Sequence, residues 1–435
     1  MGLRRPLPKP RRGLAAERTR CWPCARASET HPPRGEICAQ RGAWRRGGLD
    51  LICITAGRAA GSVAAEGKNG RQGNAGGKVL VYQVMAEWNG RDRASGRARA
   101  VKSWLDGAGI ASSVCVERYR VDDAAMGLEP AKRVAASRRE DAVLILHRDC
   151  MPRRAGRYLG KKGGKLLFYG TAPISPSPPR GEGDGPREGE EMARILARYG
   201  EGLRVVVHSQ RTKGELAGMG CDQESIEVIP VVAEWERLAE MRGDRHLREY
   251  LDDGITNLLF CGEIAPQSRL VDLLDIFLAY HRLVNAASRL VLCGTPRLGY
   301  LRSLLAEVAE RGIDDAVLLL ADTRWAEKAA CLETAHVFMS PGGGEEAFAE
   351  VATALLYSIP VVARENGYLE EYLDGSGIVY GDEDPVLVAE LLENVRTDPL
   401  LRERVLLAQE KRYAEVGESE MRERFRQALG RIGVD

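Results

Sequence analysis

A regular alternation of short apolar runs and helical patterns over residues 255–400 constrains the fold of this chain more than any other feature. The apolar runs cover residues 257–261, 289–293, 316–320, 336–340, 360–363 and 377–380. Helical patterns lie between them at 271–284, 301–311, 325–334, 350–357 and 385–395. Strands that alternate with helices predict a parallel sheet with helices on both faces. We therefore expect an α/β, Rossmann-like domain over residues 255–410.

A second alternation precedes this one. Strand-like apolar runs lie at 78–84, 141–146, 165–169, 204–208 and 226–232, and residues 95–105 have helical spacing. This pattern predicts another Rossmann-like domain over residues 78–245, so that two domains face each other across a cleft. In open sheets of this kind, ligands bind beyond the carboxyl ends of the strands. A last helix is expected within residues 411–435, where it would pack back across both domains.

Residues 1–77 differ in composition from the rest of the chain. They are rich in Arg, Gly, Pro and Ala, and Lys and Arg outnumber Asp and Glu there by about three to one. Because no sustained periodicity supports a packed core, we predict a disordered basic extension. The net charge of the whole chain is only +1, so no nucleic-acid partner is expected.

The sequence also bears on localisation and cofactors. No apolar run approaches the roughly 20 residues that cross a bilayer, which favours a cytoplasmic protein and leaves peripheral contact with the inner face of the membrane open. The CxxC of Cys21 and Cys24 has no second ligand pair at zinc spacing. A GxGxxG fingerprint for a dinucleotide is missing as well. The prediction is therefore that the chain binds neither a metal nor a cofactor.

Two loops at predicted strand ends have residues suited to a ligand. Gly262 begins a loop that leads through Arg269 into a helix, and a helix N-terminus beside a guanidinium can hold a phosphate. In the segment 340–348, three glycines allow close backbone approach and are followed by Glu345 and Glu346. Carboxylates accept hydrogen bonds from sugar hydroxyls, but they also stabilise a helix N-terminus. The residues alone leave both interpretations open.

Some polar residues of the first domain have two interpretations. His147 ends a predicted strand, where it is either an acceptor contact or a structural histidine. Trp88 follows the first strand and either stacks on a sugar or packs in a loop. The run Arg93, Arg97 and Arg99 is typical of a solvated helix face, with contact to an anionic acceptor or a membrane surface as the alternative.

The order of motifs resembles the retaining glycosyltransferases of family 4, which have the GT-B fold and belong to the glycosyltransferase group 1 type. In the second domain the resemblance lies in NLLFCGEIAP (257–266), RLVLCG (289–294), AHVFMS (335–340), IPVVA (359–363) and GYLEE (367–371). In the first domain GRDRAS (90–95) occupies the place of the first Gly-containing loop. FYGTAP (168–173) occupies the place of an acceptor-side segment, and Ser209 follows a strand where the family often has Ser.

This resemblance implies a function and a set of site residues. Such enzymes move a sugar, here expected to be of hexose type, from a nucleotide diphosphate sugar to a hydroxyl of a glycan or lipid-linked acceptor, with retention and in glycan or polysaccharide synthesis. Basic side chains stabilise the leaving diphosphate where other enzymes use a metal. The candidate catalytic residues are Glu345, Glu346 and Tyr169. The candidate donor-binding residues are Gly262, Glu263, Ser268, Arg269, Gly343, Gly344, Phe348 and Thr353. The candidate acceptor-side residues are Gly90, Asp92, Ser95 and His147.

The chain departs from the family pattern at several of these positions. Glu263 stands at the position of the usual Arg, Ser268 at that of the usual Lys and Thr353 at that of the second Glu; Tyr169 replaces the acceptor-side His. Arg269, one residue beyond the Lys position, is the direct substitute. In a partly desolvated cleft, the loss of two cations together with the added anion at position 263 should cost several kcal/mol of transition-state stabilisation, at about 1.4 kcal/mol for each tenfold in rate.

Three hypotheses follow from the pattern and its departures. The first is an active glycosyltransferase with a modified donor site. The second is a catalytically inactive GT-B relative that acts as a binding or scaffold protein. The third is another enzyme of two Rossmann-like lobes, such as a nucleotide-sugar epimerase, although analogy of fold is weak evidence for function.

Overall fold

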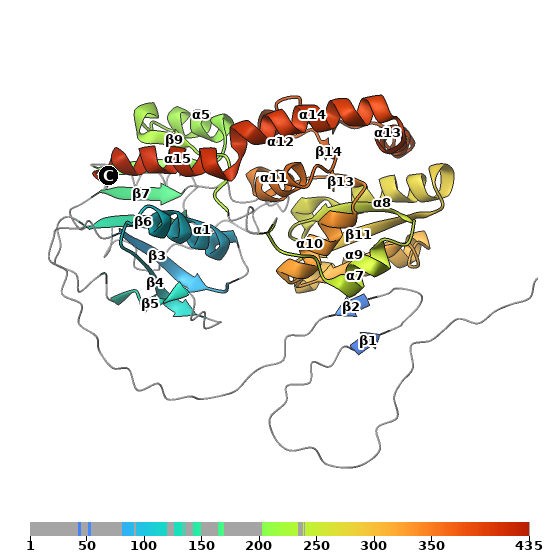
Figure 1. The fold of residues 1–435 in the computed structure, drawn as a ribbon, viewed down its shortest axis with the longest axis horizontal. Helices are drawn as coiled ribbons and strands as arrows, with labels where there is room; N and C mark the ends of the chain where they lie inside the picture. The colour runs from blue at the N-terminus through green and yellow to red at the C-terminus, as the bar shows by residue number, and fades with distance from the viewer. Residues whose placement is uncertain are drawn as a thin grey trace, which may run out of the picture. The chain divides into compact units, whose positions relative to one another are not determined.

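The computed structural model describes residues 42–44, 51–53, 81–90, 93–119, 126–132, 134, 142–148, 164–168, 202–233, 238 and 240–434. In these residues the chain forms two sheets of mainly parallel strands, and helices connect the consecutive strands between residues 256 and 380 (Figure 1). We call residues 81–233 the first lobe and residues 256–397 the second lobe. The α/β architecture of two Rossmann-like domains is the one that the sequence predicts.

The first lobe contains a seven-stranded parallel sheet in the order β5-β4-β3-β6-β7-β8-β9. Its elements are β3 (Val81–Trp88), α1 (Arg93–Gly107), β4 (Ser112–Tyr119), β5 (Glu129–Pro130), β6 (Val143–His147), β7 (Lys165–Phe168), β8 (Leu203–Val207), α5 (Gln210–Gly218), η3 (Gln223–Ser225) and β9 (Ile226–Val228). Because β4 pairs with one side of β3 and β6 with the other, the strand order reverses between β3 and β6. This reversal is the switch point at which open α/β sheets bind ligands.

The other sheet has the order β1-β2-β12-β11-β10-β13-β14-β15, in which β1 (Gly42–Trp44) and β2 (Leu51–Cys53) precede both lobes in the sequence and the other six strands belong to the second lobe. These six strands are β10 (Thr256–Cys261), β11 (Ser288–Gly294), β12 (Val317–Ala321), β13 (Val337–Ser340), β14 (Val361–Arg364) and β15 (Ile378–Tyr380), all mutually parallel. The segments between them are η4 (Pro266–Ser268), α8 (Leu270–Ala279), η5 (Tyr280–Val284), α9 (Leu298–Arg311), α10 (Trp325–Thr334), η6 (Glu345–Ala347), α11 (Phe348–Leu356) and α12 (Tyr368–Leu373), and α13 (Pro385–Thr397) follows β15. The switch point of this sheet lies between β10 and β13.

Strand β10 shows why the apolar runs form central strands. All six of its residues are buried, because helices cover both faces of the sheet. Successive side chains of a strand point to opposite faces. Accordingly, Leu259 and Cys261 belong to one apolar core, whereas Leu258 and Phe260 belong to another on the opposite face.

Two short strands lie within the segment predicted to be disordered. The strands β1 (Gly42–Trp44) and β2 (Leu51–Cys53) pair in an antiparallel manner, and β2 adds in parallel to the edge strand β12. The apolar run around β2 is too short to predict a strand from sequence, so the prediction for residues 1–77 did not include this pairing. The other residues of that segment lie outside the described part of the chain.

The C-terminal helices contact both lobes. On the second lobe, Gln409 of α14 (Pro399–Val416) donates to the Ile359 carbonyl (2.8 Å) and accepts from the Val361 N–H (3.0 Å). On the first lobe, Glu418 of α15 (Glu418–Gly430) accepts from Trp104 Nε1 at 3.0 Å. Figure 1 shows α15 along the first lobe and α14 over the second. Helices α14 and α15 therefore connect the two lobes through direct contacts.

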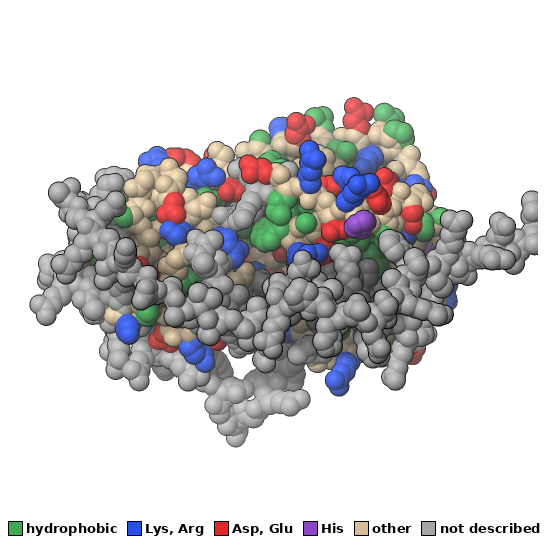
Figure 2. Space-filling model, turned by 60° about the horizontal axis from the view of Figure 1, so that its bottom comes forward, with side chains coloured by type: hydrophobic (Ala, Val, Ile, Leu, Met, Phe, Trp, Pro, Cys, Tyr) green, Lys and Arg blue, Asp and Glu red, His purple; other side chains and the backbone are tan. Residues whose placement is uncertain are grey.

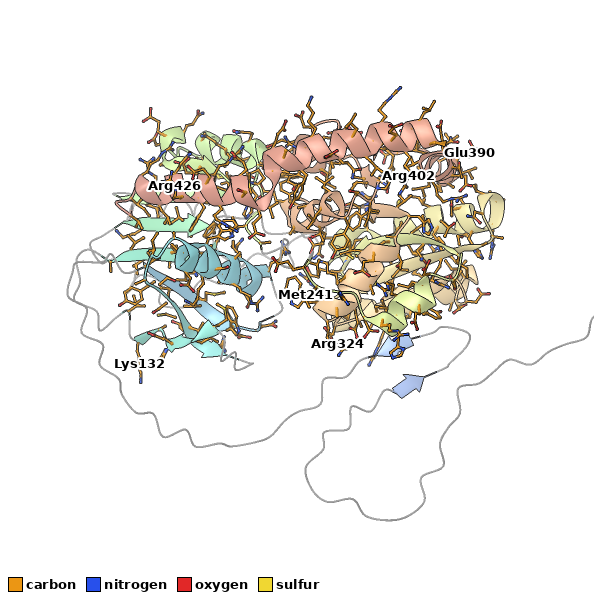
Figure 3. All side chains as sticks on the ribbon, viewed as in Figure 1. Lys132, Met241, Arg324, Glu390, Arg402 and Arg426 are labelled. Carbon is orange, nitrogen blue, oxygen red and sulfur yellow. The ribbon has the colours of Figure 1, made fainter. Side chains whose placement is uncertain are left out.

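The surface carries charges of both signs. Figure 2 shows Lys and Arg side chains interspersed with Asp and Glu over the visible described surface. Figure 3 labels Arg402 of α14 and Arg426 of α15 and draws their side chains. Helix α7 (Arg245–Leu251) lies at the bottom of the second lobe in Figure 1. Among the described residues, no helix is both long enough and apolar enough to cross a membrane.

Candidate functional site

Three loops converge at the switch point of the second sheet. The loop after β10 and the glycine loop after β13 touch, since a Cβ atom added at Gly342 would lie 2.8 Å from Arg269 Cγ and 2.9 Å from the Gln267 carbonyl oxygen. The loop after β11 approaches as closely, because a Cβ at Gly294 would lie 1.7 Å from the Gly262 carbonyl oxygen. Side chains at these two positions would push the loops apart, so glycine is required at both. The predicted Gly262 and Gly343 loops thus border one site.

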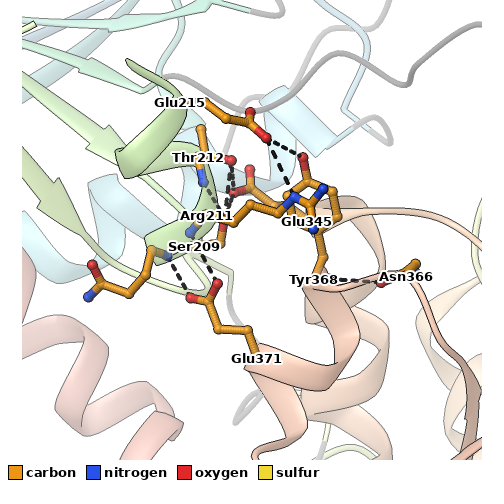
Figure 4. A network of polar contacts seen from close by, with 9 residues as sticks. Ser209, Arg211, Thr212, Glu215, Glu345, Asn366, Tyr368 and Glu371 are labelled. Carbon is orange, nitrogen blue, oxygen red and sulfur yellow. Dashed lines mark hydrogen bonds and ion pairs between the residues drawn. The ribbon is translucent and has the colours of Figure 1, made fainter. Parts of the chain in front are cut away.

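The glycine loop ends at a buried carboxylate. Glu345 follows Gly344 and opens the short helix η6, and its side chain accepts hydrogen bonds from Ser209 Oγ (2.5 Å) and Thr212 Oγ1 (2.6 Å) (Figure 4). Both donors belong to the first lobe, where Ser209 is also the N-cap of α5 and accepts from the Thr212 N–H. The predicted sugar-binding carboxylate therefore lies against the start of a first-lobe helix.

A second carboxylate from the second lobe reaches the same helix end. Glu371 of α12 accepts from the backbone N–H groups of Gln210 (2.6 Å) and Arg211 (3.1 Å), two of the donors that a helix N-terminus leaves unpaired. Arg211 in turn lies over the Tyr368 ring, 5.0 Å from its centroid. We call the contacts of Ser209, Thr212, Glu345 and Glu371 the interlobe network (Figure 4).

Asn366 holds the glycine loop next to α12. Its side-chain amide donates to the Gly343 carbonyl, and its oxygen accepts from the N–H groups of Tyr368 (3.0 Å) and Leu369 (2.8 Å). Gly343 itself has φ +94°, a backbone conformation that favours glycine. Asn366, from the segment between β14 and α12, therefore fixes the glycine loop that would approach a ligand.

Two other predicted site residues near Glu345, namely Glu346 and Phe348, lie in different environments. Glu346 is half-buried beside the glycines, and no hydrogen bond to it is found among the described residues. Phe348 is buried and stacks on Tyr372, with ring centroids 4.4 Å apart, so it belongs to the core rather than to an open surface.

The substituted donor positions Ser268 and Thr353 satisfy their hydroxyl groups internally. Ser268 Oγ donates to the Glu263 carbonyl (2.5 Å), and Thr353 Oγ1 donates to the Ala349 carbonyl one helical turn back (2.7 Å). Both side chains are buried. Each therefore stabilises its own loop or helix in the present arrangement.

The charged donor positions are paired. Glu263 accepts from Arg297 Nε at 2.6 Å and from Gln267 Nε2 at 3.0 Å, so it is not a bare anion. Arg269 has a left-handed backbone, φ 51°, and its guanidinium pairs with Asp272 at 2.6 Å. The expected substitute cation thus lies beside the glycine loop, but its guanidinium binds a carboxylate of α8.

Three of the predicted acceptor-side residues, Gly90, Ser95 and His147, lie at the switch point of the first sheet. Ser95, in the first turn of α1, accepts from the N–H groups of Asn89 and Gly90 at 3.3 and 3.2 Å and so shapes the loop after β3. His147 is the last residue of β6, the other strand at this switch point. The remaining two predicted residues, Asp92 and Tyr169, lie outside the described residues.

His147 is fully buried in a polar chain that also involves Arg97. Arg97 Nε donates to His147 Nδ1 (3.1 Å), which leaves the ring proton on Nε2 to reach Gln83 Oε1 (3.1 Å). His208 Nε2 also lies 3.4 Å from Arg97 Nη1. The interpretation of Arg97 as part of a solvated face is wrong, because this side chain is buried beneath the switch point. Trp88 is fully buried too, which favours packing in the loop over sugar stacking.

A titratable cluster that the sequence did not reveal lies under the second switch point. Burial raises the pKa of Glu350 on α11, and the charges of Lys328 and Arg93 oppose this effect. Desolvation is the largest effect on the Lys328 ammonium and disfavours it, but Glu350 and the neighbouring cysteines together raise the pKa of Lys328. The thiols of Cys261 and Cys293 are neighbours on paired strands and lie close to the same ammonium. The positive charge of Lys328 on α10 and the negative charge of Glu350 on α11 therefore compensate each other inside this region.

The residues missed by the sequence analysis share one property. Thr212 and Arg297 act through contacts with segments far away in sequence, so no local motif marks them. Glu371 lies in the GYLEE segment, but its contacts with α5 cannot be read from that segment. Ser209 had a local signal as a polar N-cap after a strand, which is typical of a helix start. The carboxylate that it contacts, Glu345, was predicted from the glycine loop, but the pairing of the two residues was not.

Comparison with known proteins identifies the fold. No protein-family model and no curated protein sequence matches the chain. Among solved structures, HepE of Anabaena in complex with UDP and glucose matches with 11% identity and a TM-score of 0.61, over 81% of this chain and 99% of that one. A glycosyltransferase from Rickettsia africae matches with 11% identity and a TM-score of 0.62, over 82% and 100%.

A third solved structure shows the same arrangement. WaaG, a glycosyltransferase involved in lipopolysaccharide biosynthesis, matches with 12% identity and a TM-score of 0.55, over 81% of this chain and 100% of that one. Since each likeness extends over both lobes, the chain has the GT-B type of fold, with two Rossmann-like domains.

Proposed function

We propose that this chain is a glycosyltransferase that moves a hexose-type sugar from a nucleotide diphosphate sugar to an acceptor hydroxyl, with retention. The observation that carries the proposal is the position of Glu345. This buried carboxylate ends a glycine loop at the switch point of one Rossmann-like sheet and contacts the other lobe directly. A donor held at that switch point would therefore lie next to the lobe that would carry the acceptor.

The chemistry needs charge stabilisation at two places. Cleavage of the anomeric C–O bond builds positive charge on the sugar and negative charge on the leaving diphosphate. In this proposal Glu345 and Glu346 accept hydrogen bonds from sugar hydroxyls, and the N–H groups of the glycine loop donate to phosphate oxygens. The proposed reaction uses no metal, because side-chain cations and backbone donors supply the stabilisation. The complexes of HepE with UDP and with UDP-glucose support a nucleotide sugar as the ligand of this fold.

The acceptor would bind at the first switch point. Gly90 and Ser95 shape the loop there, and Asp92 and Tyr169 remain proposed acceptor-side and catalytic residues. A glycan or lipid-linked acceptor, used in glycan or polysaccharide synthesis at the cytoplasmic side of the membrane, fits this proposal. The role of WaaG in lipopolysaccharide biosynthesis supports this class of acceptor.

The proposal is tested by turnover of the purified full chain. Release of nucleoside diphosphate from UDP-glucose, UDP-galactose and GDP-mannose is followed with and without lipid-linked and oligosaccharide acceptors. Glu345→Ala combined with Glu346→Ala should lower the rate by at least about 100-fold, since a group that contacts the transition state contributes about 3 kcal/mol or more. Glu310→Ala on the exposed side of α9 is the matched control. Absence of turnover with all donors, or equal rates in the two variants, would contradict the proposal.

A non-catalytic relative that binds a ligand or partner is the second candidate. The internal hydrogen bonds of Ser268 and Thr353 favour it, since both substituted positions are satisfied without a donor. This alternative predicts that UDP or GDP binds without any turnover of the corresponding sugar donor. The turnover experiment therefore separates the two candidates.

A further inference from the structure

Glu263 is the substituted residue whose negative charge most opposes a diphosphate, yet it positions a positively charged side chain. Arg297, the N-cap residue of α9, reaches it from the neighbouring loop after β11, and Nε alone makes the 2.6 Å contact. In the described part of the chain, the terminal nitrogens of Arg297 make no further hydrogen bond, and 54% of its side chain is exposed. One edge of the guanidinium is thus fixed while the other edge faces outward.

A second arginine approaches from the other lobe. Arg93 begins α1, immediately beyond the first switch point, and its Nη2 lies 3.8 Å from Glu263 Oε2. Arg93 also influences Glu350 near the start of α11 electrostatically. Around the single carboxylate of Glu263, the two lobes therefore present two arginines, with a net positive charge.

We propose that Arg297 and Arg93 bind the diphosphate of the nucleotide, in place of the cations missing at positions 263 and 268; this inference rests on the proposed function. Glu263 acts as a positioning residue, because it holds Arg297 through Nε and leaves the terminal nitrogens for a bidentate contact with phosphate. A guanidinium that is already oriented loses less side-chain freedom on binding. Arg269 differs from Arg297, because both its Nε and its Nη2 contact Asp272.

The test is calorimetric titration of the full chain with UDP and with GDP. With whichever nucleotide the wild type binds, Arg297→Ala and Arg93→Ala should each weaken binding about 10-fold, as expected for one charged hydrogen-bonding group on a partly exposed site. Arg302→Ala on the exposed face of α9 is the matched control and should leave the dissociation constant within about twofold. Melting curves verify that the variants are folded, and Arg93→Ala tests the site independently if Arg297→Ala does not fold.

The outcomes are distinct. Weaker binding in the two arginine variants but not in Arg302→Ala supports the inference. Nucleotide binding that is equal in all variants overturns the inference and leaves the proposed function intact. Failure of the wild type to bind either nucleotide overturns the proposed function, and with it the inference.

Discussion

The hydrogen bond between Ser209 and Glu345 joins the two lobes directly. Replacement of Ser209 by Ala removes the N-cap bond to the Thr212 N–H (3.0 Å), which contributes about 1 kcal/mol. It also removes a donor at 2.5 Å from a buried carboxylate, which contributes about 1.5–3 kcal/mol. Thr212 still donates to Glu345, so we expect a total loss of about 2.5–4 kcal/mol in the free energy of unfolding.

A double-mutant cycle separates the interlobe part of this loss from the N-cap part. Glu345→Gln keeps the shape of the side chain and an acceptor oxygen but removes its charge. Because a charged acceptor is worth about twice a neutral one, the coupling free energy between the two substitutions should be about 1–2 kcal/mol. Urea unfolding followed by tryptophan fluorescence gives the four free energies.

The matched control for this cycle is Ser303→Ala on the exposed face of α9. It should change the free energy of unfolding by no more than about 0.5 kcal/mol and show no coupling to Glu345→Gln. If Ser209→Ala costs no more than Ser303→Ala, or if the coupling is close to zero, Glu345 does not contact the first lobe as described.

Three further predictions concern pH, the glycine loop and metals. His336 Nδ1 accepts from the Asn257 N–H, and burial lowers the pKa of this histidine. The stabilising contribution of neutral His336 is therefore present above about pH 6.5 and is lost as the pH falls through the lowered folded-state pKa. Melting temperatures measured between pH 8 and 5 should therefore fall less steeply for His336→Asn than for the wild type, whereas His246→Asn at an exposed position should match the wild type. Gly342→Ala should weaken UDP binding at least about 10-fold by pushing two loops apart, and Gly299→Ala, which meets no atom within 4 Å, should not; equal calorimetric affinities would refute this. Turnover of the sugar donor should be the same with EDTA as with added Mg²⁺, and a rate that collapses in EDTA would contradict the metal-free mechanism.

The sequence predicts those parts of the fold where burial alone decides the structure. All six predicted strands of the second lobe are present, because each central strand is apolar on both faces. Strand β4 was missed, since Ser112, Ser113, Glu117 and Arg118 interrupt its apolar pattern at the side of the sheet. The strands β1 and β2 were missed because three-residue strands have too little pattern to detect.

The site was predictable only where one segment supplies the whole signal. The glycine loop and Glu345 are contiguous, so their combination of close backbone approach and carboxylate is visible in the sequence. The donors to Glu345 lie 136 and 133 residues earlier in the chain, on the other lobe. Likewise, Glu263 read in isolation predicts repulsion of a diphosphate, whereas the structure pairs it with Arg297, 34 residues away.

A crystal structure of the full chain with UDP tests this nucleotide site directly. We expect the diphosphate at the carboxyl ends of β10 and β13, between the Gly262 and Gly343 loops, with the terminal nitrogens of Arg297 within hydrogen-bonding distance of a phosphate oxygen. UDP bound elsewhere on the chain, or at this switch point with its phosphates directed away from the glycine loop, would contradict it.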